Sequence, residues 1–179
     1  MEVFFYMEKS NSAVKTIAYM AIYCAVFVVF DRVSDMLNLF KMASGGKLNF
    51  GPIALLVCSY HLGWKKGAMV GVVSVFLQLV IGSVSWYGIG SFLLDYLIAY
   101  AVYGIASMFP NFGYFYSGIL VTSVIRLLSS TLAGTILWET PFWASLSYNA
   151  TYMIPTTVCA IIVVPLLVER LKPVFRRYQ

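Results

Sequence analysis

Charged residues are scarce in this sequence. Only 11% of its 179 residues are Asp, Glu, Lys or Arg, whereas 61% are hydrophobic, and the mean hydropathy is +0.85. A soluble globular domain carries roughly 25% charged residues, because its surface must face water. The shortage of charge excludes a surface of that kind and indicates an integral membrane protein.

Residues that build metal centres and catalytic sites are also few. The chain has three cysteines and one histidine, with no Cys-x-x-Cys pair, which argues against a disulfide framework and a metal site. No GxSxG, HExxH or P-loop motif appears. We therefore expect no metal, no cofactor and no enzymatic activity. The basic residues gather at the chain ends and in one loop, a pattern typical of membrane topology signals rather than nucleic-acid binding.

Long apolar runs, in contrast, are abundant. A membrane-spanning helix needs roughly 20 mainly apolar residues, and six candidates follow one another without a linker. We predict an all-α integral membrane protein, a single domain of residues 1–179 with six transmembrane helices. The expected spans cover residues 13–30, 50–62, 68–84, 91–109, 115–138 and 146–168.

The distribution of lysine and arginine predicts the orientation. With six spans, one side of the membrane holds eight basic residues, from both termini and the turn at 61–67, and the other side holds three. Because basic residues favour the cytoplasmic side, both termini are expected in the cytoplasm. The predicted location is the bacterial plasma membrane, crossed several times.

One carboxylate, Asp95, lies inside the apolar, tyrosine-rich segment Phe92–Tyr100. An ionisable residue within a span is costly and is a functional-site candidate. The predicted topology places it near the outer face, at the depth of polar and aromatic residues from two later spans and one loop. Such a set is typical of a small-molecule pocket. These neighbours are Ser129, Ser130, Trp138, Ser147, Tyr148, Asn149, Tyr152, Trp86 and Tyr87.

Each candidate also has a structural interpretation. Asp95 binds ligand or pairs with Arg126, the only basic residue deep inside a span. The amide of Asn149 reads a heteroaromatic ring or joins two helices. Four aromatic residues either stack on a ligand ring or form an interfacial belt. They are Tyr96, Tyr148, Trp138 and Trp143.

A row of small residues marks the first span. Ala18, Ala21 and Ala25 recur at intervals of three and four residues, so they share one helix face. Small residues let helices approach closely. The row serves either packing within the fold or docking on another membrane protein.

The chain resembles the substrate-binding subunits (S-components) of energy-coupling factor vitamin transporters, most closely their thiamine-specific branch. Segment 94–100 (LDYLIAY) is similar to that branch's LEYxxAF motif. The stretch from Arg126 to Trp138 resembles RxxxHxxxGxxxW, and 147–155 (SYNATYMIP) resembles xYNxxYMxP. Size, six spans and the alanine-rich first helix agree with this family.

The resemblance implies ligand contacts at Asp95, Tyr96, Trp138 and Asn149. It also implies that the alanine row docks on a transmembrane coupling subunit, that two cytoplasmic ATPases drive transport, and that the loop at 31–49 acts as a lid. The working hypothesis assigns polar recognition to Asp95, Asn149 and Ser130. It assigns ring stacking to Trp138, Tyr96 and Tyr148, with Tyr152 beside them and Arg126, Trp143 and Trp86 as further candidates.

At three positions this sequence differs from the thiamine-specific branch, so the ligand of this protein stays open. Asp95 replaces a glutamate, Ser130 replaces a histidine, and Ala144 stands where the branch has a tyrosine. Sites built to hydrogen-bond one ligand discriminate against others, so these changes reshape the pocket. Thiamine is the leading ligand. A B6 vitamer or the thiamine pyrimidine precursor is the alternative, and a structural subunit without a ligand is an alternative of another class.

Overall fold

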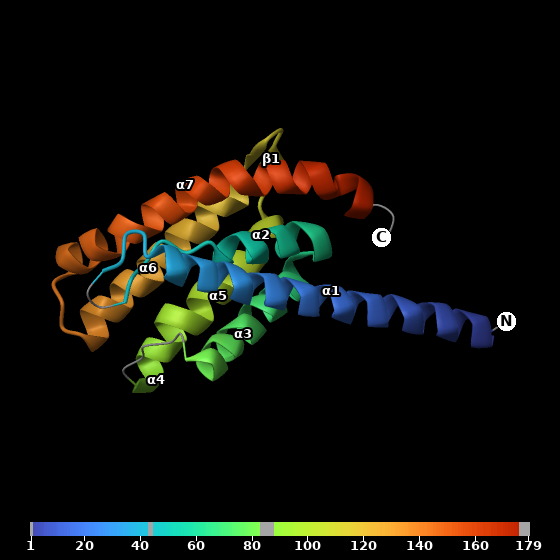
Figure 1. Cartoon of the computed structure of the whole chain (residues 1–179), viewed down its shortest axis with the longest axis horizontal. Helices are drawn as coiled ribbons and strands as arrows, with labels where there is room; N and C mark the ends of the chain where they lie inside the picture. The colour runs from blue at the N-terminus through green and yellow to red at the C-terminus, as the bar shows by residue number, and fades with distance from the viewer. Residues whose placement is uncertain (1, 43–44, 83–87, 176–179) are drawn as a thin grey trace.

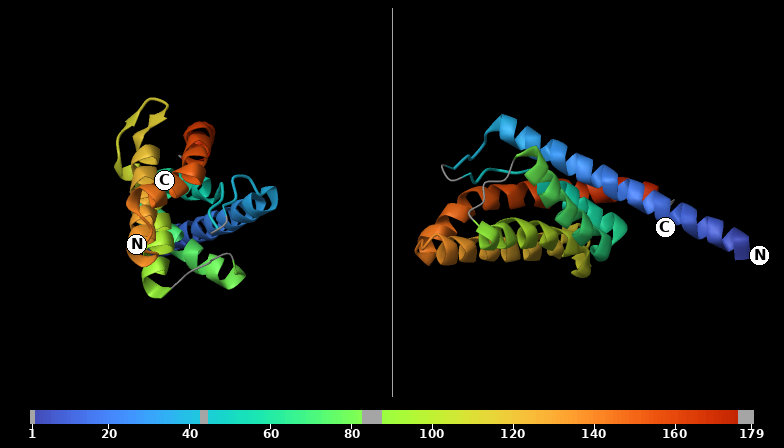
Figure 2. Two further views of the ribbon diagram at one scale, coloured as in Figure 1. Left: turned by 90° about the vertical axis from the view of Figure 1, so that its left-hand side faces the viewer. Right: turned by 90° about the horizontal axis from the view of Figure 1, so that it is seen from below.

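The computed structural model describes residues 2–42, 45–82 and 88–175. It is a bundle of helices, and the N-terminal part of α1 extends beyond the others (Figure 1, Figure 2). One small antiparallel hairpin pairs Asn111 with Tyr116. The elements are α1 (Glu2–Leu37), α2 (Gly51–Leu62), α3 (Trp64–Ile81), α4 (Gly88–Ser91), η1 (Phe92–Ile98), α5 (Ala99–Ala101), η2 (Val102–Met108), β1 (Asn111–Phe112), β2 (Phe115–Tyr116), α6 (Ser117–Leu137) and α7 (Phe142–Phe175).

The helices are apolar enough to cross a membrane, as the sequence predicts. Five regions of the described chain are both long and apolar enough, and the shorter apolar α2 accompanies them. The five are Ala13–Leu37, Trp64–Ile81, Gly88–Met108, Ser117–Leu137 and Phe142–Pro173. The chain is therefore a helical membrane protein.

Several helices begin or end away from the predicted span boundaries, most clearly at two places. The first helix continues past residue 30 to Leu37, because Asp31 and Ser34 are buried and accept hydrogen bonds from the loop that follows, Asp31 from Asn49 Nδ2 and Ser34 Oγ from the Phe50 amide. The expected turn at 61–67 is reduced to Gly63, whose φ of 85° lies in the region that favours glycine. Helix α3 begins directly after it.

Helix α7 runs without interruption from Phe142 to Phe175, although Pro155, Pro165 and Pro173 lie inside it. Proline removes a backbone hydrogen bond and bends a helix. The resulting arc is visible in Figure 1, where α7 curves over the bundle. Its first half, which carries Tyr148 and Asn149, thereby leans towards the loop that follows α1.

The segment from Gly88 to Met108 is helical but irregular, and Asp95 lies at its irregular point. Residues Phe92–Ile98 form a π-helix, a conformation that is rare and frequent at functional sites. The hydroxyl of Ser129 donates to the carbonyl of Leu94 at 2.7 Å. Ser129, which was predicted to lie at the same depth as Asp95, thus supports the backbone beside that residue.

Glycines hold α3 tightly against this segment. A Cβ on Gly71 would lie 2.7 Å from the carbonyl oxygen of Tyr100, and one on Gly67 would meet the carbonyl oxygen of Gly104. Small residues permit such close helix approach in membranes. The contact fixes the wall of the bundle that carries Asp95 and Tyr100.

Replacing Gly104 by alanine tests this contact. A Cβ there would overlap the backbone of Gly67 and Ala68, and overpacking costs about 1–3 kcal/mol. We expect Gly104→Ala to lower the thermal unfolding midpoint of the detergent-purified protein. The control is Gly90→Ala, whose Cβ meets only the flexible end of Leu137, at 3.1 Å. Equal midpoints for the two variants would contradict the close approach.

Candidate ligand-binding site

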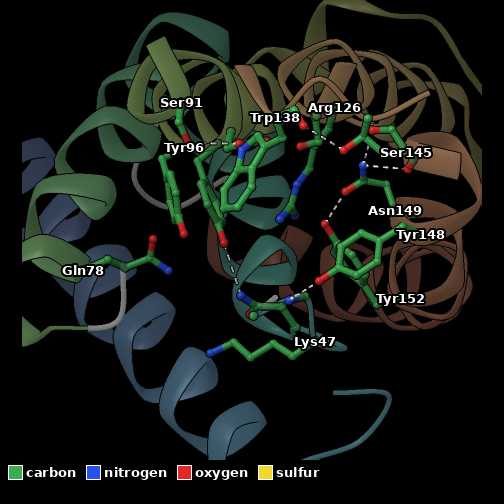
Figure 3. Close-up of a pocket in the computed structure, with 18 of the residues that line it drawn as sticks. Lys47, Gln78, Ser91, Tyr96, Arg126, Trp138, Ser145, Tyr148, Asn149 and Tyr152 are labelled. Carbon is green, nitrogen blue, oxygen red and sulfur yellow. Dashed lines mark hydrogen bonds between the residues drawn. The ribbon is translucent and has the colours of Figure 1, made fainter. Parts of the chain in front are cut away.

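A cavity of about 440 Å³ opens between α1, α3, the 88–108 segment, α6, α7 and the loop that follows α1. Figure 3 shows its lining side chains converging from these elements. Its size lies in the range of small-molecule sites, roughly 300–1,000 Å³. The lining residues are Asp31, Gly45, Gly46, Lys47, Asn49, Gln78, Ser91, Asp95, Tyr96, Tyr100, Arg126, Ser130, Gly134, Trp138, Thr140, Ala144, Ser145, Tyr148, Asn149 and Tyr152.

Asp95 presents its carboxylate to this cavity with few protein partners. The Ser91 hydroxyl donates to Asp95 Oδ2 at 3.3 Å, and the Ser130 hydroxyl faces the same carboxylate. An ionised carboxylate accepts at about four lone-pair positions. Asp95 therefore keeps capacity for hydrogen bonds from a ligand.

Arg126 does not pair with Asp95: no ion pair joins these two described residues. The guanidinium instead lies over two aromatic rings, with its Cζ 4.7 Å from the centroid of Tyr100 and 5.4 Å from that of Tyr103. Arg126 Nη1 also donates to the Tyr103 hydroxyl at 3.4 Å. Cation–π contacts of this kind stabilise a desolvated cation. The positive charge is thus held by tyrosines and leaves the carboxylate available.

Asn149 is held in place by neighbours on its own helix. Its Nδ2 donates to the carbonyl of Ser145 at 2.9 Å, and the Tyr152 hydroxyl donates to Asn149 Oδ1 at 2.6 Å. Ser145 in turn donates to the carbonyl of Thr131 at 3.0 Å. A Cβ on Gly134 would meet the Ser145 hydroxyl. Glycine at 134 therefore lets α7 pack against α6 with the Asn149 amide at the cavity wall.

The loop after α1 closes one side of the cavity and is fastened to α7. The backbone amide of Gly46 donates to the Tyr148 hydroxyl, and the amide of Asn49 donates to Thr156 Oγ1, both at 3.2 Å. A Cβ on Gly46 would overlap the ring of Tyr152. Only glycine lets this loop lie directly on the two tyrosines.

A buried polar cluster joins the same loop to α1. Asp31 is 2% exposed. It accepts from Asn49 Nδ2 at 2.8 Å and pairs with Lys47 Nζ at 3.1 Å. Lys47 also pairs with the more exposed Asp35. Asp31, Lys47 and Asn49 line the cavity but were not predicted from the sequence.

A signal for Asp31 was nevertheless present. Cys24, Phe27, Asp31 and Ser34 are buried, and they recur at intervals of three and four residues, so they share one helix face. An acid that continues an apolar stripe faces the interior and needs a partner there.

The structure brings most of the predicted site residues together. Those in the cavity wall are Asp95, Tyr96, Arg126, Ser130, Trp138, Tyr148, Asn149 and Tyr152. Ser147 is exposed and bonds the Trp143 carbonyl at 2.8 Å. Trp143, 74% exposed, is outside the wall because it faces away at the start of α7. Trp86 and Tyr87 lie outside the described residues.

Fold and cavity together define a helical membrane protein with a ligand-sized cavity that polar and aromatic side chains line. The family model "Thiamine transporter protein (Thia_YuaJ)" matches residues 17–176, and the chain belongs to this family. The "Thiamine transporter ThiT" of Bacillus subtilis (strain 168) is 29% identical over 178 residues, covering 87% of this chain and 91% of the relative.

The fold has a solved counterpart. A structure of ThiT from Listeria monocytogenes superposes with a TM-score of 0.68 over 87% of this chain and 96% of that one, at 16% identity. At this identity the likeness concerns the fold alone. The resemblance to the thiamine branch, inferred from three motifs, is confirmed. The family is one of transport proteins, not enzymes.

The buried cluster of Asp31, Lys47 and Asn49 yields a prediction with a built-in control. Asp31→Ala removes an acceptor that the buried Asn49 amide uses, which costs about 1–3 kcal/mol. Asp35→Ala removes the other partner of Lys47, but Asp35 is 40% exposed, and exposed ion pairs contribute less than about 1 kcal/mol. In thermal unfolding we expect a clearly larger fall for Asp31→Ala. A larger fall for Asp35→Ala would refute the assignment.

Proposed function

We propose that this protein captures thiamine at the outer face of the membrane, as the substrate-binding subunit of an energy-coupling factor transporter. The observation that carries the proposal is a carboxylate, Asp95, that faces a ligand-sized cavity and forms no ion pair with any described basic residue, in a chain of the thiamine transporter family. Thiamine is a cation with an aminopyrimidine ring. An unpaired carboxylate among aromatic side chains suits both properties.

Different residues of the cavity wall bind different parts of thiamine. Asp95 accepts from the aminopyrimidine, and Ser130 and Asn149 supply further hydrogen bonds. Tyr96, Trp138 and Tyr148 offer their ring faces to the two heterocycles, since aromatic rings stack at centroid distances of about 4.5–7 Å. Tyr152, bonded to Asn149 Oδ1, fixes the orientation of that amide.

The orientation follows from the charges at the two ends of the bundle. Figure 1 places the α6–α7 connection and the loop after α1 at the end away from both termini. Lys65, Lys66, Arg170 and Lys172 belong to the other end, where α3 begins and α7 finishes. With α2 counted as the sixth span, the positive-inside rule puts both termini in the cytoplasm and the cavity towards the exterior.

Tryptophan fluorescence of the detergent-purified protein tests the ligand. We expect saturable quenching by thiamine, because Trp138 lines the cavity. Asp95→Asn keeps the size of the side chain but removes its charge. Hydrogen bonds to charged groups contribute about 1.5–3 kcal/mol, so we expect thiamine to bind roughly 10- to 100-fold more weakly.

Glu169→Gln is the matched control, since Glu169 bonds Tyr116 and Lys172 and does not line the cavity. Pyridoxine and the thiamine pyrimidine complete the panel, because Asp95, Ser130 and Ala144 depart from the branch pattern. Saturation by pyridoxine with no response to thiamine would overturn the ligand assignment. Unchanged thiamine affinity in Asp95→Asn would overturn the role of the carboxylate.

The coupling partner is proposed to dock on α1. Ala18, Ala21 and Ala25 are exposed, whereas Cys24 and Phe27 on the other face are buried. The described part of the chain therefore does not cover these small residues. They leave a shallow strip on which a transmembrane helix of the coupling subunit fits closely, and that subunit carries the two ATPases.

Ala21→Trp fills this strip with a large ring. We expect the variant to lose co-purification with the coupling subunit and to keep its affinity for thiamine, because Ala21 lies outside the cavity wall. Leu128→Trp, on an exposed position of α6, is the control and should co-purify normally. Intact co-purification of Ala21→Trp would refute docking on this strip.

A further inference from the structure

Gln78, on α3, is a cavity residue to which neither the family motifs nor the proposed recognition assigns a role. Its side chain is 3% exposed, and its Oε1 accepts no hydrogen bond from the described protein. A buried acceptor without a donor is unfavourable, because it has lost water and gained nothing in exchange. Native proteins keep such groups rarely, and each one calls for an explanation.

Gln78 lies on the buried face of α3, but it differs from the other residues of that face because it lines the cavity. Gly67, Gly71, Ser74 and Gln78 recur at intervals of four, three and four residues and are all buried, so they share the inner face of the helix. Gly67 and Gly71 approach the 88–108 segment closely. Gln78 continues this buried face, and its side chain lines the cavity.

Gln78 and Asn149 stand on opposite sides of the cavity. In Figure 3, the Gln78 amide points into the space bounded by Tyr96 and Lys47, and Asn149 lies across from it beyond Trp138. Lys47 already pairs with Asp31 and Asp35. On this side of the cavity, Gln78 Oε1 is an acceptor that receives no hydrogen bond from the described protein, and its lack of charge suits a hydroxyl donor.

We propose that Gln78 is a specificity-determining residue whose side-chain carbonyl binds the hydroxyl at the ligand end remote from Asn149. For thiamine, whose capture is the proposed function on which this inference rests, that group is the hydroxyethyl hydroxyl. The aminopyrimidine then lies against Asp95 and Asn149, and the aromatic residues stack on the rings. Gln78 accepts a hydrogen bond from the hydroxyl at the opposite end of the ligand. A ligand without this hydroxyl leaves Gln78 unpaired.

The test compares two ligands on wild-type protein and Gln78→Met, with binding followed by calorimetry. The ligands are thiamine and its analogue with an ethyl group in place of the hydroxyethyl group. We expect the wild type to prefer thiamine about tenfold, the scale of one buried hydrogen bond. Gln78→Met should bind both ligands equally. Val80→Met, an exposed change on the same helix, should keep the wild-type preference.

A second variant and a stability measurement separate recognition from structure. Gln78→Glu retains a carbonyl acceptor of the same length and should keep the preference for thiamine. The thermal midpoint of ligand-free Gln78→Met should not fall, because no protein hydrogen bond to Oε1 is lost.

The inference would be overturned if Gln78→Met bound both ligands more weakly by the same factor, or if it bound the isolated thiamine pyrimidine more weakly. A wild type that binds both ligands equally would also overturn it, whereas a wild type that binds neither would overturn the proposed function.

Discussion

The side chain and backbone of Asn49 make the contacts on which the shape of the cavity depends. Its Nδ2 donates to Asp31 of α1 and, at 3.3 Å, to the hydroxyl of Tyr100. Its backbone amide donates to Thr156 of α7, and its Oδ1 accepts from the amide of Gly51, where α2 begins. One buried residue thereby links four helical elements. Because buried polar groups must find partners inside the protein, none of these elements can shift without leaving another unpaired.

The way in which the charged side chains near the cavity are paired explains how a cavity inside an apolar bundle can accept a cation. Arg126 is balanced by the faces of Tyr100 and Tyr103, and Lys47 by Asp31 and Asp35. Within the described residues, the Asp95 carboxylate is approached by the hydroxyl groups of Ser91 and Ser130, and Arg126 acts on it only through its electrostatic field. A carboxylate already paired with arginine would have to exchange that partner for the ligand. Separation of the two charges removes this competition.

The sequence predicts the membrane class and much of the cavity wall, for a physical reason. Asp95, Asn149 and Trp138 stand out because polar or amphipathic groups are conspicuous in apolar helices, and topology alone sets their common depth. Ser129 shares that depth yet serves the π-helix through Leu94. Depth along a helix does not specify the direction of a side chain, and Trp143, a further candidate, is exposed and does not line the cavity.

The residues that the sequence analysis missed depend on contacts between distant segments. Lys47 and Asn49 lie in a loop, where no periodicity indicates a direction, and their partners are on α1, α7 and the 88–108 segment. Gln78 was overlooked for another reason: it is neutral and lies within an apolar helix. Gln78 shares a helix face with Gly67 and Gly71. Because the 3.6-residue periodicity applies to polar residues as well, this position predicts that Gln78 is buried.

The three positions at which this chain departs from the thiamine branch all change the cavity in the same way. Asp95, Ser130 and Ala144 are each smaller than the residue of the motif, and all three line the cavity. Their combined effect is to remove atoms from the lining of the cavity, while an acid and a hydroxyl remain there. Recognition needs an acceptor, a donor and a ring face in fixed relation more than it needs particular side chains. A shorter acid can meet that need when the backbone beside it is repositioned, and the π-helix around Asp95 is the element that sets this position.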